Sequence, residues 1–135
     1  MTMLFGWMMV FALVTSPTAF AQMTRDAAIE KTEGILDNLK AGKASALVKE
    51  FDDKMAQALP ESKLQGAWPS VIEQFGAFKQ IDERREGRFQ GRQTVELILA
   101  FERNTIVMRT VYDDAGKVGG LVFRPKDQAV LPSAK

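Results

Sequence analysis

Residues 94–101 read TVELILAF, and this stretch decides the fold. Large apolar residues occupy every second position from Val95 to Phe101, which is the period of a β-strand with one buried face. The alternate positions carry Glu96, but also the apolar Ile98 and Ala100. We therefore expect a strand with one face on a core and a second face that is partly covered.

Hairpin signals flank this stretch on both sides. Further strands are expected over residues 78–89, 105–112 and 118–123, with turns at residues 87–91, 103–104 and 113–117. The third turn, Asp113-Asp114-Ala115-Gly116, suits a type I turn followed by a left-handed glycine. Short turns join neighbouring antiparallel strands, so the pattern predicts a meander of about four strands.

Helical patterns precede the strands. Apolar residues recur at helical spacing in three segments, over residues 24–42, 45–59 and 61–76. Thr24 is a suitable N-cap for the first, Gly42 ends it, and Pro60 stops the second. Pro69 lies inside the third and predicts a kink or two short helices. Helices segregated from strands indicate an α+β fold, with three helices under a curved antiparallel sheet that forms a cone.

The first 21 residues have the pattern of a secretory signal. They are apolar from Leu4 to Val14, break at Pro17, and end in Ala19-Phe20-Ala21, which suits signal peptidase. The first basic residue is Arg25, so an uncleaved anchor stays an alternative. We expect cleavage after Ala21, a periplasmic or secreted bacterial protein with no stable membrane span, a single domain over residues 22–125, and a flexible tail over residues 126–135.

Composition excludes several classes of function. The chain has no histidine and no cysteine, so neither a Ser-His-Asp triad nor a thiol nucleophile nor a zinc–sulfur site can form. Its 18 basic and 17 acidic residues leave a net charge of +1, whereas nucleic-acid binders usually carry a large positive excess. We expect no metal, no cofactor and no nucleic-acid partner.

Two segments together resemble a known bacterial family. They are residues 58–78, with Ala58-Leu59-Pro60-Glu61, Trp68 and Gly76-Ala77-Phe78, and residues 101–125, with Phe101-Glu102, Asp113, Gly116-Lys117 and Gly120-Leu121. This set is similar to domain of unknown function 3887. The resemblance implies a nuclear-transport-factor-2-like, cystatin-type cone over roughly residues 24–125. It implies no catalytic residues.

A cone of this kind is either filled by large side chains or open as a pocket. The candidates for lining a pocket are Trp68, Phe75, Phe78, Phe101, Met108, Arg109 and Tyr112. The tips of Trp68 and Tyr112 need polar partners when buried, and Arg109 could meet a ligand carboxylate. Each of these residues could equally be part of a core or, for Arg109, of the surface.

Charged residues leave further alternatives open. Glu96, Glu102 and Asp82 are candidate acid–base groups, although the phase of Glu96 points it towards solvent. Four arginines at positions 84, 85, 88 and 92 form either an anion site or a solvated hairpin face. The acidic pair in the third turn suits a hairpin better than calcium.

These observations favour an exported, non-catalytic accessory or binding domain. It would hold a small apolar ligand or a protein partner, or form a homodimer through the sheet. The alternative is a small hydrolase or isomerase that uses one buried carboxylate with Tyr112 or Arg109. A deep pocket with convergent polar groups would favour the enzyme, and a cone filled by Phe and Trp would favour the accessory domain.

Overall fold

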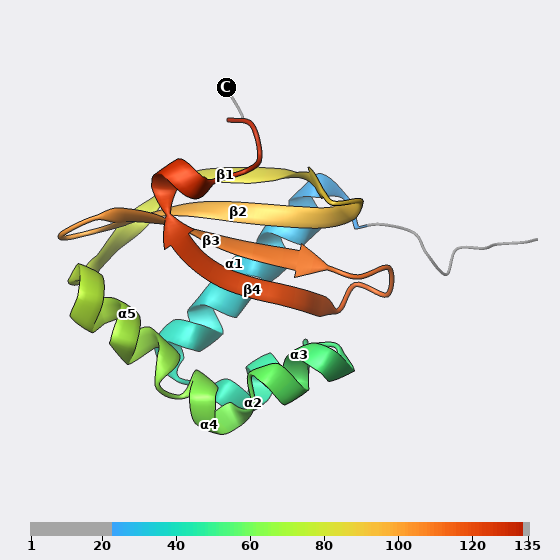
Figure 1. Cartoon of the computed structure of the whole chain (residues 1–135), viewed down its shortest axis with the longest axis horizontal. Coiled ribbons are helices and arrows are strands. Elements are labelled where there is room, and N and C mark those ends of the chain that lie inside the picture. Colours follow the sequence, from blue (N-terminus) through green and yellow to red (C-terminus); the bar gives the residue numbers. More distant parts are fainter. Residues whose placement is uncertain (1–22, 134–135) are drawn as a thin grey trace, which may run out of the picture.

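The computed structural model describes residues 23–133 and shows an α+β fold. Four antiparallel strands form one sheet in the order β1-β2-β3-β4 (Figure 1). The strands are β1 (Phe78–Phe89), β2 (Arg92–Phe101), β3 (Thr105–Tyr112) and β4 (Val118–Pro125). The predicted meander is confirmed.

The turns lie close to their predicted places. The first is tighter than expected, because β1 continues through Gly87 and only Gln90 and Gly91 separate it from β2. Both residues have positive φ, 55° and 79°, which is the backbone of a two-residue type I′ hairpin. In the third turn the Asp113 carboxylate accepts hydrogen bonds from the backbone N–H groups of Ala115 and Lys117.

Five helices, within the described part of the chain, replace the three that the sequence predicts. They are α1 (Arg25–Ala41), α2 (Ala44–Val48), α3 (Asp53–Ala58), α4 (Glu61–Leu64) and α5 (Ala67–Phe75). The ends of α1 are as expected: Thr24 Oγ1 accepts from Ala27 N–H, and Gly42 has φ 72°. The other two predicted helices are each divided in two.

The break between α2 and α3 is caused by the sheet. Phe51 forms an isolated parallel bridge with Val118 of β4, through hydrogen bonds from Val118 N–H to Glu50 O and from Asp52 N–H to Val118 O. A residue paired in this way has left the helical backbone. The Asp52 side chain then caps α3 by accepting from Met55 N–H, a new N-terminus that costs little.

The break between α4 and α5 falls at Gln65 and Gly66, just before Pro69. Pro69 is the third residue of α5, where a backbone N–H would have no partner within the helix. The sequence predicts a kink or two short helices here, and the structure has two short helices, with Pro69 in the first turn of the second.

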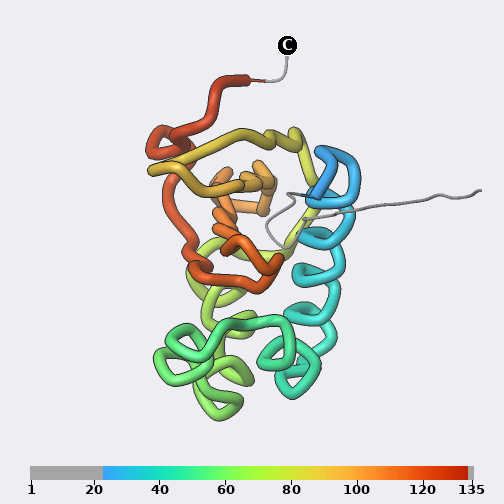
Figure 2. The backbone as a smooth tube through the Cα atoms, turned by 90° about the vertical axis from the view of Figure 1, so that its right-hand side faces the viewer, coloured from blue at the N-terminus to red at the C-terminus, as the bar shows by residue number. Residues whose placement is uncertain are grey.

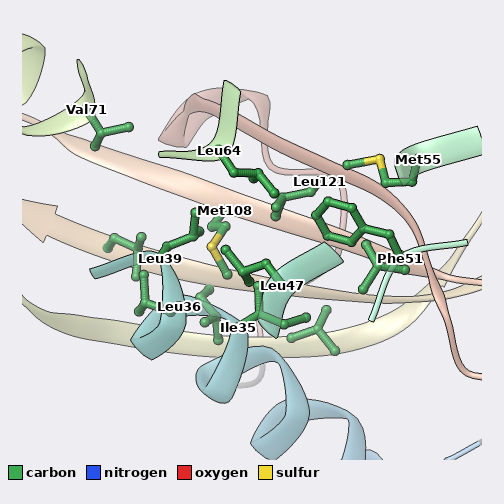
Figure 3. Close-up of a cluster of buried hydrophobic side chains, with 14 of the residues drawn as sticks. Ile35, Leu36, Leu39, Leu47, Phe51, Met55, Leu64, Val71, Met108 and Leu121 are labelled. Atoms are coloured by element: carbon green, nitrogen blue, oxygen red, sulfur yellow. The ribbon is translucent and has the colours of Figure 1, made fainter. Parts of the chain in front are cut away.

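The core lies between the helices and one face of the sheet, here called the inner face. Figure 1 shows α1 crossing behind the strands, and Figure 2 shows α2–α5 gathered on one side of the sheet. The close-up in Figure 3 shows α1 and α2 residues such as Leu39 and Leu47 packed towards Met108 of β3. Val95, Leu97 and Leu99 of β2 complete this core and are fully buried.

Residues 126–133, in the predicted flexible tail, lie against the opposite face of the sheet, here called the outer face. A short 3₁₀ helix, η1 (Lys126–Gln128), follows β4, and Figure 2 shows the chain passing over the sheet on the side away from α2–α5. Leu131 is buried. Tail residues therefore cover part of the outer face.

Across residues 23–133, no helix is both long and apolar enough to span a bilayer. The predicted signal segment and its cleavage site lie outside the described residues.

Candidate functional site

Four of the predicted pocket residues form one aromatic cluster, in which Phe101 is buried and Trp68, Phe75 and Phe78 are partly buried. Phe101 lies at its centre, with ring centroids 5.7 Å from Trp68, 6.0 Å from Phe75 and 5.5 Å from Phe78. Trp68 and Phe78 also meet edge to face at 5.9 Å, a favourable geometry for aromatic rings. The Lys40 ammonium lies 4.6 Å from the Phe78 ring centroid. These rings pack on one another at this end of the fold.

Two more predicted residues lie on the inner face of β3. Met108 is fully buried in the core. Tyr112 is also buried, and its hydroxyl lies 2.6 Å from Thr32 Oγ1 of α1. Thr32 already donates its own proton to Ala28 O, so Tyr112 is the donor in this pair. The polar tip of Tyr112 therefore ties β3 to α1.

Burial raises the pKa of Tyr112 to about 12, with a smaller raising effect from the charge on Glu50 and an opposing effect from the hydrogen bond with Thr32. Nearby, Lys31 Nζ forms an ion pair with Glu50 at 3.1 Å and donates to Gly116 O at 2.6 Å. A phenol with a pKa this high stays protonated at neutral pH. It acts here as a structural donor.

The seventh predicted residue, Arg109, lies on the outer face and so apart from the other six. The strand register places Arg85 of β1, Glu96 of β2 and Arg109 of β3 directly opposite one another. We call these three residues the charge row. Its sign alternates across three neighbouring strands, which favours the pairing of both arginines with the central glutamate.

The phase of Glu96 along the strand predicts that its side chain points into solvent. In the structure Glu96 is instead 0% exposed. The phase assignment to the outer face is correct, and the tail then buries the side chain. Arg109 Nε donates to Glu96 Oε2 at 2.9 Å, and the guanidinium of Arg109 lies 5.3 Å from the Phe89 ring centroid. A buried carboxylate of this kind needs several partners to offset its lost hydration.

The tail supplies those partners through its main chain. Leu131 N–H donates to Glu96 Oε1 at 2.8 Å, and Val130 N–H lies 3.0 Å from Oε2 and 3.2 Å from Oε1. Two consecutive backbone N–H groups thus converge on one carboxylate, as in the anion-binding nests of other proteins. With Arg109 added, both oxygens of Glu96 are engaged.

The two arginines of the charge row bind carbonyl groups of the same segment. Arg109 Nη2 donates to Gln128 O at 2.7 Å, and Arg85 Nη1 donates to Leu131 O at 3.0 Å. The charge row therefore forms hydrogen bonds with four main-chain groups between residues 128 and 131. None of these contacts depends on which side chains the tail carries.

Glu83 extends the charge row along β1. Its carboxylate accepts from Arg85 Nη2 at 3.0 Å and from Ser133 Oγ at 2.7 Å. The hydrogen bond with Glu83 raises the pKa of Arg85 above its usual range, burial opposes this, and the charges of Glu83 and Glu96 add to the increase. Arg85 Nε is buried without a hydrogen-bond partner among residues 23–133.

One side chain of the tail has a matched position in the sheet. A Cβ atom at Gly87 would lie 3.1 Å from Leu131 Cδ2, a separation that few real contacts show. The absence of a side chain at Gly87 is what lets Leu131 approach β1. Ile98 and Val107 are also buried outside the main core cluster, so the outer face has an apolar part beside the charge row.

The four arginines around the first hairpin do not converge on one anion site. Arg84 forms an ion pair with Glu33 of α1, Arg85 belongs to the charge row, and Arg88 donates to Gly91 O. Arg92 lies near Gly119 of β4. Strand alternation sends neighbouring side chains to opposite faces.

Surface depressions lie away from the aromatic cluster's centre. One of about 430 Å³ is lined by residues of both charges: Arg25, Asp26, Ile29, Glu30, Glu33 and Arg84. Another, of about 390 Å³, includes Phe75 and Phe123 at the edge of β4. Within the described residues there is no cluster of carboxylates that could hold a metal ion.

The charge row could have been noticed from the sequence only in part. Glu96 and Arg109 occupy opposing positions once the register of the hairpin at residues 103–104 is assumed, and opposite charges favour such a pair. Nothing local indicates that the tail covers them, because its contacts span 34 residues or more from Glu96.

A family model described as a protein of unknown function (DUF3887) matches residues 32–121. Neither a curated protein nor a solved structure matches the chain.

Proposed function

The chain belongs to the DUF3887 family, whose description names no activity, and from the structure we propose that it is an exported, non-catalytic accessory domain that works by binding a protein partner. The proposal includes a cone of the nuclear-transport-factor-2-like kind, which is supported by one four-stranded antiparallel sheet with helices packed on one face. Export rests on the leader pattern of residues 1–21.

The observation that carries this proposal is the packing of the interior. Residues that could have lined a ligand pocket instead contact one another: Phe101 meets three aromatic rings within 6.0 Å. Met108 and Tyr112 are buried in the same core. Because apolar ligands bind in hollow, apolar sites, the packing of these rings on one another favours a protein partner over a small apolar molecule.

The catalytic alternative draws on the buried carboxylate of Glu96 beside Arg109. A general base needs a lone pair free to take a proton from substrate. In Glu96 both oxygens accept hydrogen bonds, from Arg109 and from two backbone N–H groups. This arrangement holds the carboxylate as an acceptor for the tail and favours a binding role.

A homodimer through the sheet is a narrower possibility within the same proposal. The tail covers the outer face over β1, β2 and β3, where Glu96 is 0% exposed. A second copy would therefore have to use the part of the face near β4 or displace the tail.

Native mass spectrometry of the protein purified from its own cells tests the proposal. We expect a chain that begins at Gln22, retains no stoichiometric small molecule, and is recovered with a protein partner at low salt. A tightly held apolar ligand would contradict the filled interior, and a mass that includes residues 1–21 would contradict cleavage. Glu96→Gln tests the catalytic alternative. We expect this substitution to change the recovery of the protein partner, and we expect neither the substituted nor the unsubstituted chain to hydrolyse ester substrates.

A further inference from the structure

The outer face carries a site of unusual construction. A fully buried carboxylate, two arginines and a glycine on neighbouring strands hold an extended segment of the chain. Ala129 has φ −62° and ψ 139°, so the segment enters the site in an extended conformation. The charge row binds four main-chain groups of residues 128–131: Glu96 accepts from two N–H groups, and the two arginines donate to two carbonyl oxygens.

Such a site recognises the main chain of an extended segment and requires one particular side chain. Two consecutive N–H groups must meet Glu96, and the second of the two residues must place an aliphatic side chain over Gly87. Known peptide-recognition sites combine these features: main-chain hydrogen bonds supply affinity and one pocket supplies selectivity.

The tail can leave this site without opening the main core cluster, which includes none of its residues. When the tail leaves, Glu96 and Arg109 become hydrated and stay paired. The departure uncovers Leu131 and the small apolar part of the outer face, Ile98 and Val107, but none of the main core cluster. When the tail binds, hydration of the charge row is lost and is only partly offset by the new hydrogen bonds. A partner segment that makes the same contacts can therefore replace the tail, although the local concentration of the tail at the site is high.

We propose that the charge row and Gly87 form a peptide-binding site, and that residues 128–133 occupy it as a stand-in for a segment of the protein partner. The partner segment is extended, has free N–H groups on two consecutive residues, and carries a leucine-like side chain on the second. This inference rests on the proposed function, since it names where and how the partner would bind.

Peptide binding to the full chain tests it. The probe is a dye-labelled peptide with the sequence of residues 126–133, KDQAVLPS, followed by fluorescence anisotropy. The variant Leu131→Asp in the full chain removes the aliphatic anchor and places a carboxylate beside Glu96, so the tail should vacate the site. We expect saturable binding to this variant at least about tenfold tighter than to the unsubstituted chain, whose own tail competes.

Three matched controls separate the parts of the site. In the Leu131→Asp background, Glu96→Gln should weaken peptide binding at least about tenfold, because an amide cannot accept from both N–H groups and Arg109 together. Gly87→Val should block binding while leaving every charge in place. A probe methylated on the two nitrogen atoms equivalent to Val130 and Leu131 should not bind.

The proposal is overturned if the folded Leu131→Asp variant, checked by circular dichroism, binds no peptide, or if the methylated probe binds as well as the parent. It is also overturned in favour of a second copy if the unsubstituted chain is a dimer in solution that Leu131→Asp converts to a monomer. If a partner recovered from cells stays bound to Leu131→Asp/Glu96→Gln, the inference fails while the proposed function stands.

Discussion

The two faces of the sheet are built from alternate residues of the same strands and hold their neighbours by different physics. The inner face of β2 presents Val95, Leu97 and Leu99 to the helices. The outer face of β2 presents Glu96 to the tail. Apolar burial is non-directional and depends on area, whereas the charge row depends on geometry and must first lose its hydration. The inner face therefore stabilises the fold, whereas the outer face is suited to the exchange of one bound segment for another.

The largest expected effect is on the inner face. Leu97→Ala removes a side chain that is 0% exposed and leaves a cavity, so we expect the free energy of unfolding to fall by about 2–5 kcal/mol. Urea denaturation measures this. Val130→Ala on the 44% exposed Val130 is the control and should change stability by less than about 0.5 kcal/mol.

The buried hydroxyl of Tyr112 makes the stability of the inner face depend on pH. Below pH 10 both folded and unfolded chains hold the phenol proton; between pH 10 and about 12 only the folded chain does. Stability should therefore fall as pH rises through this window, by about 3 kcal/mol at most. The measurement is the difference in the free energy of unfolding between the unsubstituted chain and Tyr112→Phe, followed from pH 9 to 12. A constant difference would show that the hydroxyl is not buried.

On the outer face, Glu96→Gln should lower the free energy of unfolding by about 1–3 kcal/mol. The loss is bounded, because the tail can detach and let water reach Arg109. Amide hydrogen exchange should accelerate at Val130 and Leu131 and stay unchanged at Leu97. If Glu96→Gln destabilises the chain more than Leu97→Ala does, the outer face contributes to stability as a core does, which would contradict the difference drawn between the two faces.

The smallest effect is expected at Thr110, on the inner face. Its hydroxyl oxygen is buried with no hydrogen-bond partner in the described part of the chain. Thr110→Val keeps the shape and removes the unpaired group, so stability should rise by up to about 1 kcal/mol. Thr32→Val is the matched control and should be destabilising, because it leaves the hydroxyl of Tyr112 without an acceptor. Equal effects at both sites would contradict these assignments.

Local patterns predicted much of the fold. Alternation between Val95 and Phe101 indicated β2 and its inner face, and the turn residues indicated the hairpins. The divided helices could not be read in the same way, because Phe51 leaves its helix to pair with Val118, 67 positions away in the chain. Periodicity reports on neighbours within a few residues, and such a bridge lies beyond it.

The candidate site shows the same limit. The residue types of the charge row and the faces they occupy follow from strand alternation. Their burial does not, since it requires the tail to return over β2.

Sequence alone therefore determined the α+β class, the antiparallel order, the inner-face residues and the absence of histidine and cysteine chemistry, because each depends on composition or short-range periodicity. Only the tertiary structure decided that the aromatic side chains pack on one another, and that Glu96 is buried beneath the main chain of residues 130–131. Both results depend on contacts between segments far apart in the chain, whose free energies are set by packing and desolvation in the assembled fold.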